Sequence, residues 1–346
     1  MGNGRQNLLK PGRRGVVKTI GTIGIVGGLG TGTVNAQSET QQITDWNDLH
    51  AIRDGLDGEY ILTTDLDEST AGYEEYVADP ETGFEPIGKT QTEFTGTFDG
   101  QGNEIRDLVI EKPDSELVGL FGLAGDGAII ENITLVDVEI TGDYDVGALI
   151  GGSNGTINTS AVTGAVSGRR NVGGIVGRNR KAIIRDSAAG VTITGESNVG
   201  GLVGKNDNKI RNSWATGKVT GESSVGGLVG LLNYTGFTPG TIIESWASGD
   251  VDGDSAVGGL VGDSFHNDLN GEIMKSAASG AITGESEVGG LIGSIGASTI
   301  ITNSVALGQV TGTEYVGGFA GYNRNTIRTS FSCGNVTGDQ QIGGFI

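Results

Sequence analysis

The chain offers few side chains of the kinds that commonly carry out catalysis. Its 346 residues include two histidines, His50 and His266, and one cysteine, Cys333. His50 stands in the string LHAIRD, which lacks the HExxH spacing of zinc peptidases. His266 lies in SFHNDLNGE (264–272), where a Ser-His-Asp arrangement is the alternative to a plain surface histidine. We predict no catalytic, cofactor-binding or metal-binding residues.

A charged turn is the second candidate for chemistry. The string FDGQGNEIRD places Asp99, Glu104, Arg106 and Asp107 close together. In a polysaccharide-active β-helix, acids and bases from adjacent coils gather in one groove, and this turn could begin such a cluster. We favour the structural interpretation, in which the turn starts the repeats and its charges face water.

An acidic column is the third candidate. It follows a set of turn glycines and comprises Asp143, Glu196, Glu222, Asp254, Glu285 and Asp339. Like charges about 5 Å apart repel unless cations screen them, so we expect salt to stabilise this edge. Calcium needs six to eight oxygen ligands, and one acid per coil falls short of that number.

Two tryptophans and five sequons point to saccharides. Trp214 and Trp246 occupy equivalent positions in successive repeats, so they either stack outside as a sugar platform or pack beneath the insertion at 231–240. The N-x-Ser/Thr triplets begin at Asn132, Asn154, Asn158, Asn233 and Asn335. Such triplets accept glycans in exported proteins and also arise by chance in Ser/Thr-rich repeats.

Composition narrows the class of protein. Glycine accounts for 65 residues and proline for only 5, with no Gly-X-Y period, so the chain is not collagen-like. A hydrophobic content of 36% is too high for a disordered chain. The formal net charge of −20 argues against nucleic acid as a partner.

The first 36 residues differ from the rest. Residues 1–36 hold five basic residues and no acidic one, with Arg13-Arg14 before an apolar run and Val34-Asn35-Ala36 at its end. This pattern predicts an export signal, and RRGVVK resembles the twin-arginine type. Once it is removed, we expect no membrane-spanning segment, because the remaining chain has no continuous apolar run of about 20 residues.

The remainder is dominated by a repeat. VGGLVG and its variants begin at Val118, Val146, Val172, Val199, Val225, Val257, Val288, Val316 and Ile342, at intervals of 26 to 32 residues. A period of this size is typical of a solenoid, whose units must stack to bury an apolar face.

Between these strings, three columns share one strand parity. The first column consists of the serines Ser160, Ser187, Ser213, Ser245, Ser276, Ser304 and Ser330. Small residues follow two positions later and Val or Ile six positions later, so all three columns face the same side of a strand, which we interpret as the interior. Each period should contain two or three short strands separated by glycine turns. The sequence therefore predicts an all-β, right-handed parallel β-helix of about eight coils.

The two ends of the repeat array differ from its middle. Residues 37–117 contain a short amphipathic helix after Asp45, a strand at 59–66 and an acidic loop, so they are a candidate small α/β cap. At Ile346 the chain stops inside a motif, which predicts that either a partner or missing sequence covers the strand edge.

The repeat and its lead-in resemble a known family. VGGLVG alternating with I-x-N-S-x-A-x-G-x-V-T-G, preceded by DWNDLHAIRDGLDGEYILTTDLD and FTGTFDGQGNEI, is similar to the GLUG-motif proteins over roughly residues 43–346. Such repeats occur in surface proteins of bacteria and archaea, including adhesins and the non-catalytic parts of immunoglobulin A peptidases. The acidic chain also resembles exported proteins of halophilic archaea.

These patterns predict three segments and a role. We expect a signal peptide at 1–36, a cap with the first coil at 37–117 and GLUG-type repeats at 118–346. The resemblance implies an extracellular or cell-surface, non-enzymatic adhesion or display module without a cofactor, whose partners are surface glycans or other surface proteins. The alternative is a polysaccharide-active β-helix lyase or hydrolase.

Overall fold

The computed structural model describes residues 40–79, 81–233, 239–265, 271–296 and 299–346. The chain divides into residues 1–37 and a compact unit, residues 38–346. The predicted signal peptide and His266 lie outside the described residues.

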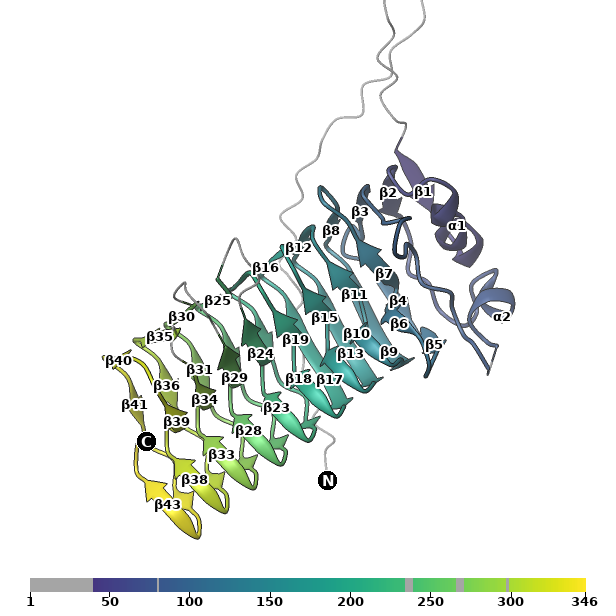
Figure 1. The fold of residues 1–346 in the computed structure, drawn as a ribbon. Coiled ribbons are helices and arrows are strands. Elements are labelled where there is room, and N and C mark those ends of the chain that lie inside the picture. The colour runs from purple at the N-terminus through teal and green to yellow at the C-terminus, as the bar shows by residue number, and fades with distance from the viewer. Residues whose placement is uncertain (1–39, 80, 234–238, 266–270, 297–298) are drawn as a thin grey trace, which may run out of the picture. The chain divides into compact units, whose positions relative to one another are not determined.

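The described unit is a stack of coils whose strands pair in parallel from one coil to the next (Figure 1). Each coil passes through four sheets, called here sheets 1 to 4 in the order in which the chain meets them. The prediction of a parallel β-solenoid is confirmed, while the handedness of the coil stays a prediction. A coil contributes strands to four sheets, rather than forming the two or three strands expected per period, because glycine bends divide it into strands of two to eight residues.

Sheet 1 starts in the cap and continues through every coil. Its strands are β1 (Gln41–Ile43), β2 (Glu59–Leu62), β3 (Thr97–Asp99), β8 (Ile129–Glu131), β12 (Thr156–Asn158), β16 (Ile183–Arg185), β20 (Lys209–Arg211), β25 (Thr241–Ile243), β30 (Gly271–Met274), β35 (Thr299–Thr302) and β40 (Ile327–Arg328).

Sheet 2 has long strands in the early coils and divided strands in the later ones. It contains β4 (Glu104–Arg106), β5 (Val109–Glu111), β9 (Thr134–Thr141), β13 (Ala161–Ser167), β17 (Ala188–Thr194), β21 (Trp214–Ala215), β22 (Val219–Thr220), β26 (Trp246–Ala247), β27 (Val251–Asp252), β31 (Ala277–Ala278), β32 (Ile282–Thr283), β36 (Val305–Ala306), β37 (Val310–Thr311), β41 (Phe331–Ser332) and β42 (Val336–Thr337). The division begins where Gly217 replaces an ordinary strand residue.

Sheets 3 and 4 contain the two halves of each VGGLVG string. Sheet 3 consists of β6 (Glu116–Val118), β10 (Tyr144–Gly147), β14 (Arg170–Gly173), β18 (Ser197–Gly200), β23 (Ser223–Gly226), β28 (Ser255–Gly258), β33 (Ser286–Gly289), β38 (Glu314–Gly317) and β43 (Gln340–Gly343). Sheet 4 consists of β7 (Phe121–Ala124), β11 (Ile150–Ser153), β15 (Val176–Asn179), β19 (Val203–Asn206), β24 (Val229–Asn233), β29 (Val261–Phe265), β34 (Ile292–Ile295) and β39 (Ala320–Asn323).

After β1, the cap forms a helix that its own sequence specifies. Helix α1 (Trp46–Ala51) starts after Asp45, whose carboxylate accepts a hydrogen bond from the Asp48 N–H at 2.9 Å. The short 3₁₀ turn η1 (Ile52–Asp54) and helix α2 (Tyr73–Tyr76) follow. Trp46 is fully buried, and its indole N–H donates to the Asp67 carbonyl at 3.0 Å. The cap is therefore packed around an aromatic side chain.

The interior follows the predicted columns. The small-residue and Val/Ile columns are buried from Val162 and Val166 through Ala306 and Val310. The serine column, called the serine row below, is also buried, with an exposed fraction of 2% or less from Ser160 to Ser304. A row of polar side chains inside an apolar core requires hydrogen-bond partners.

The serine row provides those partners itself. From Ser160 to Ser304, each serine N–H donates to the hydroxyl of the serine in the following coil, at 3.2–3.3 Å. Each of these hydroxyls, and that of Ser330, donates to the carbonyl two residues earlier in its own coil, at 2.8–3.0 Å. Every serine thus ties its coil to a neighbour without leaving a polar group unpaired.

Candidate functional site

Sheets 3 and 4 approach each other so closely that only glycine fits between them. A Cβ atom on Gly204 of β19 would lie 2.4 Å from the Asn171 carbonyl carbon of β14, and one on Gly177 of β15 would lie 2.3 Å from that of Asp145. Contacts this short are impossible for a real side chain, so the glycines of the VGGLVG string are a packing requirement.

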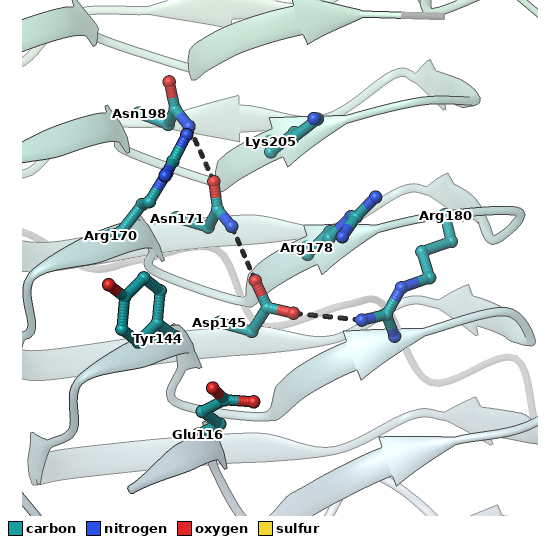
Figure 2. A pocket seen from close by; sticks show the side chains of 9 residues that line it. All are labelled: Glu116, Tyr144, Asp145, Arg170, Asn171, Arg178, Arg180, Asn198 and Lys205. Carbon is teal, nitrogen blue, oxygen red and sulfur yellow. Dashed lines mark hydrogen bonds and ion pairs between the residues drawn. The ribbon is translucent and has the colours of Figure 1, made fainter. Parts of the chain in front are cut away.

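Backbone geometry on sheet 3 selects the next residues. Asp145, Asn171 and Asn198 have φ values of 52°, 55° and 54°, a left-handed conformation that asparagine and aspartate tolerate better than most residues. Their side chains form a ladder across three coils (Figure 2). Asn198 Nδ2 donates to Asn171 Oδ1 at 2.7 Å, and Asn171 Nδ2 donates to Asp145 Oδ1 at 2.6 Å. The ladder ends at Asp145 Oδ2, which accepts from Arg180 Nη2 at 3.1 Å.

On sheet 4, one outward position changes its chemistry from coil to coil. The register places in this row, called the Arg178 row below, Leu123, Gly152, Arg178, Lys205, Leu231, Asp263, Ser294 and Tyr322. Gly152 leaves room for a neighbour, since a Cβ there would lie 2.8 Å from Arg180 Nη1. Arg180 can therefore fold over this glycine to reach Asp145.

A hollow of about 300 Å³ lies where the ladder and the Arg178 row meet. Four cationic side chains line it, and they are Arg170, Arg178, Arg180 and Lys205 (Figure 2). Two acidic side chains, Glu116 and Asp145, line it as well, together with Tyr144 and the two ladder asparagines. We call this hollow the basic pocket. Its lining is polar throughout except for one aromatic ring.

The cations in the basic pocket are incompletely paired. Arg178 Nη2 lies 3.7 Å from Oδ2 of the fully buried Asp207, which is too far for a hydrogen bond. The Arg178 Nε and Asp207 Oδ2 atoms are both buried without a hydrogen-bond partner. Burial is the main cause that lowers the pKa of Lys205, and the Asp207 carboxylate opposes this effect. The pocket therefore concentrates positive charge that its own acids do not neutralise.

Tyr144 forms one wall of the pocket and is held from outside it. The Arg169 guanidinium lies over the Tyr144 ring, 4.4 Å from its centroid. Arg169 also donates two hydrogen bonds to Asp143, at 2.7 and 3.0 Å, and these hold the pKa of that carboxyl below its usual range. The ring is thus fixed by a cation–π contact and a bidentate ion pair.

Among the sequence-predicted residues, the two tryptophans come together. Trp214 and Trp246 stack with ring centroids 4.9 Å apart and an interplanar angle of 3°. They lie on the outside of sheet 2, and Trp246 is 40% exposed. Their register partners on either side are Ala188 and Ala277, which are too small to cover the outer ring faces. The geometry of an external aromatic platform is present.

The acidic column is broken in the structure. Backbone hydrogen bonds place Arg169 between Asp143 and Glu196, and Thr313 between Glu285 and Asp339. Within the described residues, no group of three or more His, Cys, Asp or Glu side chains is arranged to hold a metal ion. The expected effect of salt on this edge stays a prediction.

The charged turn does not converge on one point. Asp99 accepts hydrogen bonds from the Gln101 N–H and from Asn132 Nδ2, both at 2.9 Å. Glu104 pairs with Arg106 on β4, and the Asp107 backbone has a φ of 57°. These residues act as turn and strand-end groups, in agreement with the structural interpretation of the sequence.

The remaining candidates lie apart from one another. The His50 ring stacks on Tyr76 in the cap, with centroids 4.0 Å apart, and burial lowers the pKa of His50. Cys333 is an exposed free thiol in the last coil. His50 therefore has the role of a cap residue.

Sequence reasoning missed the basic pocket. One signal was present, because six of the 22 Lys and Arg residues fall between positions 169 and 185 of an otherwise acidic chain. Only three of the six, Arg170, Arg178 and Arg180, line the pocket, and placing them together required knowing that sheets 3 and 4 are packed through glycine.

Comparison with known proteins identifies the repeat. The model of the GLUG motif matches residues 195–220, which run from the turn before β18 to the end of β22. The chain carries GLUG-motif repeats. The match corresponds to most of one coil, from sheet 3 through sheet 4 and sheet 1 into sheet 2.

Relatives with similar sequences are much longer than this GLUG-repeat chain. It is 36% identical over 166 residues to halomucin of Haloquadratum walsbyi, and the matched region covers 47% of this chain and 2% of that protein. It is 34% identical over 136 residues to a protein described as a Gly-rich membrane protein of Evansella cellulosilytica, covering 28% of this chain and 15% of the relative. It is 31% identical over 160 residues to an immunoglobulin A1 protease of Streptococcus sanguinis, covering 44% of this chain and 8% of the protease.

A solved structure shares the fold of the GLUG-repeat chain. A Bacteroides ovatus chain described as an immunoglobulin A1 protease superimposes with a TM-score of 0.51 at 17% identity, covering 89% of this chain and 85% of that chain. At this identity the likeness concerns the fold alone. In the described part of the GLUG-repeat chain, no helix has the length and apolarity needed to span a bilayer.

Proposed function

We propose that the chain is an exported, non-enzymatic module of the cell surface that attaches to glycans through the outer faces of its coils. Sequence likeness to a protein described as a membrane protein and to halomucin supports the surface location. The signal-like residues 1–36 support export.

The observation that carries the adhesive role is the exposed stack of Trp214 and Trp246. Two parallel indole rings flanked by alanines offer flat apolar faces beside a polar, threonine-rich sheet surface. Sugar rings bury their C–H faces against such rings, and the indole N–H remains available for hydrogen bonding. A regular parallel sheet holds the two rings rigidly, which reduces the entropy lost on binding.

The proposal is tested with the full chain on intact cells and on soluble polysaccharides. We expect antibody labelling of the chain on unpermeabilised cells, binding to neutral xylan or hydroxyethyl cellulose, and no release of reducing sugar. The double variant Trp214→Ala/Trp246→Ala should weaken binding to the neutral polysaccharide about tenfold or more. The matched control, Ile183→Ala, removes an exposed apolar side chain on sheet 1 and should leave binding unchanged. Labelling only after permeabilisation would overturn the surface location.

One observation favours the alternative of a polysaccharide-active enzyme. Asp263 in the Arg178 row is half-buried, and burial together with the nearby Glu287 raises its pKa to about 6. A carboxyl group with a raised pKa beside a second carboxylate is what a glycosidase uses as its acid. Reducing sugar released by the unmodified chain, and lost in Asp263→Asn, would establish this alternative in place of the adhesive module.

A further inference from the structure

The basic pocket has the opposite charge to the chain that contains it. The whole sequence has a formal charge of −20, yet four cationic side chains and only two acidic ones line this hollow. Cations on adjacent coils repel each other, and this repulsion costs free energy that Asp145 and Asp207 offset only in part. An anionic group placed among them would remove this cost.

The positive groups of the pocket are available to a ligand. Arg180 is paired with Asp145 and Arg178 lies beside Asp207. Among the described residues, Arg170 and Lys205 have no acidic group within ion-pair distance, and both line the hollow. Lys205 is half-buried, and its desolvated ammonium gains more from an anion than an exposed lysine would. The pocket therefore offers one guanidinium and one ammonium group without an acidic partner among the described residues.

The other lining groups suit a sugar better than an acidic peptide. Tyr144 presents a ring whose orientation Arg169 fixes, and the amides of Asn171 and Asn198 are held in a ladder. Amide groups exchange hydrogen bonds with hydroxyls, and an aromatic ring packs against the C–H face of a pyranose. No Ala, Val, Leu or Ile side chain of the described residues lines the hollow, so it offers few of the apolar contacts that usually anchor a peptide side chain. The volume of about 300 Å³ is at the lower end for small-ligand sites.

We propose that the basic pocket binds an acidic unit of an anionic polysaccharide, with its carboxylate or sulfate group between Arg170 and Lys205 and its ring against Tyr144. The inference rests on the proposed adhesive function and adds the class of ligand. It concerns a surface separate from the tryptophan stack, because the pocket is formed by sheets 3 and 4 and the stack by sheet 2.

Binding of the full chain to polygalacturonate at about 0.15 M NaCl tests the proposal. The pocket variant is Arg170→Gln/Lys205→Gln, which removes two positive charges without breaking an ion pair within the described structure. The matched control is Arg185→Gln/Lys209→Gln, which removes the same charge from exposed positions of sheet 1 in the same two coils. We expect the pocket variant to bind polygalacturonate at least tenfold more weakly and the control to stay within about twofold. Equal losses in both variants would overturn the proposal, because general charge attraction would then explain binding.

Further probes define the class of ligand. Free galacturonate should compete with the polysaccharide, whereas galactose, which lacks the carboxylate, should not. Dextran sulfate in place of polygalacturonate distinguishes a sulfate ligand from a carboxylate ligand, and either one supports the anionic site. Polyglutamate or a single-stranded DNA oligonucleotide that binds as tightly as both polysaccharides would overturn the assignment to glycans.

Failure of this inference is distinguishable from failure of the adhesive role. The pocket variant should still bind neutral xylan. The variant Trp214→Ala/Trp246→Ala should still bind polygalacturonate, and free galacturonate should still compete with that binding. If the unmodified chain binds neutral xylan but not polygalacturonate, the proposed anionic site is refuted, whereas the proposed role of the tryptophan stack is unaffected. Release of reducing sugar would refute the non-enzymatic role whatever the pocket binds.

Discussion

The serine row and the Arg178 row run through the same coils but differ in how strongly the residue type is constrained. The serine row repeats one residue because each serine must both accept from one neighbour and donate to its own coil. The Arg178 row contains glycine, arginine, lysine, leucine, aspartate, serine and tyrosine at equivalent positions. An interior row is fixed by packing and hydrogen bonding, whereas an outward row beside a hollow is free to vary and to acquire binding chemistry.

The sharpest test of this contrast uses two adjacent residues of β24. Leu232 faces the interior and is fully buried, whereas Leu231 belongs to the Arg178 row. Leu232→Lys should lower the free energy of unfolding by on the order of 5 kcal/mol or prevent folding, because an unpaired charge would be buried. Leu231→Lys should change it by less than about 1 kcal/mol, since the position is only partly buried and its register neighbours, Lys205 and Asp263, have opposite charges. Urea unfolding measures both, and similar losses would show that the outward row is as constrained as the core.

The next largest effect concerns the glycines that bring sheets 3 and 4 together. Gly204→Ala would place a Cβ atom 2.4 Å from backbone of β14, so we expect a loss of about 3 kcal/mol in unfolding free energy. Gly190→Ala on β17 is the control, because its closest contact would be an ordinary 3.5 Å. Thermal unfolding compares the two, and tolerance of Gly204→Ala would contradict the close approach that shapes the basic pocket.

Within the serine row, the test is Ser213→Ala. The change removes the hydroxyl that accepts from the Ser187 N–H and donates to the Arg211 carbonyl. The carbonyl keeps the hydrogen bond from the Asp186 N–H, whereas the Ser187 N–H would be buried without this partner. We expect a loss of about 2 kcal/mol from the unpaired N–H. Ser248→Ala, at an exposed position between β26 and β27, should cost less than about 0.5 kcal/mol. Equal stability of the two variants would show that the hydrogen bonds of the serine row do not stabilise the fold.

The smallest expected effect is the pH dependence that Asp263 contributes. Burial first, and Glu287 next, raise its pKa to about 6, while hydrogen bonds from Ser264 and Ser294 oppose the shift. Between about pH 4 and pH 6 the folded protein holds a proton that the unfolded chain has released, so stability is greater at low pH and falls as the pH rises through 6. Each pKa unit corresponds to about 1.4 kcal/mol, and with partial solvent exposure we expect about 1 kcal/mol in total. Asp263→Asn should flatten the pH profile of the melting temperature between pH 4 and 7, while Asp252→Asn, on an exposed site, should not.

The period and parity of the sequence were enough to predict the interior and the parallel stack. The serine column, the small-residue column and the Val/Ile column share one face in any strand, so their burial follows from spacing alone. The outward position of Trp214 and Trp246 followed from the opposite parity. The number of sheets did not, because it depends on which glycines bend the chain and which stay extended.

The basic pocket could not be predicted from periodicity. Arg170 and Lys205 are 35 positions apart and belong to different sheets, and they meet only because glycines let β14 and β19 approach each other. The ladder of Asp145, Asn171 and Asn198 depends on a left-handed backbone that asparagine favours but does not by itself reveal. Functional chemistry here depends on the relation between sheets, which spacing along one strand does not encode.

The hydrogen bonds of the serine row all point the same way along the stack. An N–H always donates toward the following coil, so one end of the row presents an acceptor and the other a donor. Ser160, at the acceptor end, is buried beside the preceding coil, which contains β8, whereas Ser330 is at the donor end. A coil that extended this bonding would therefore have to follow Ser330 and run in the same direction as the coils before it.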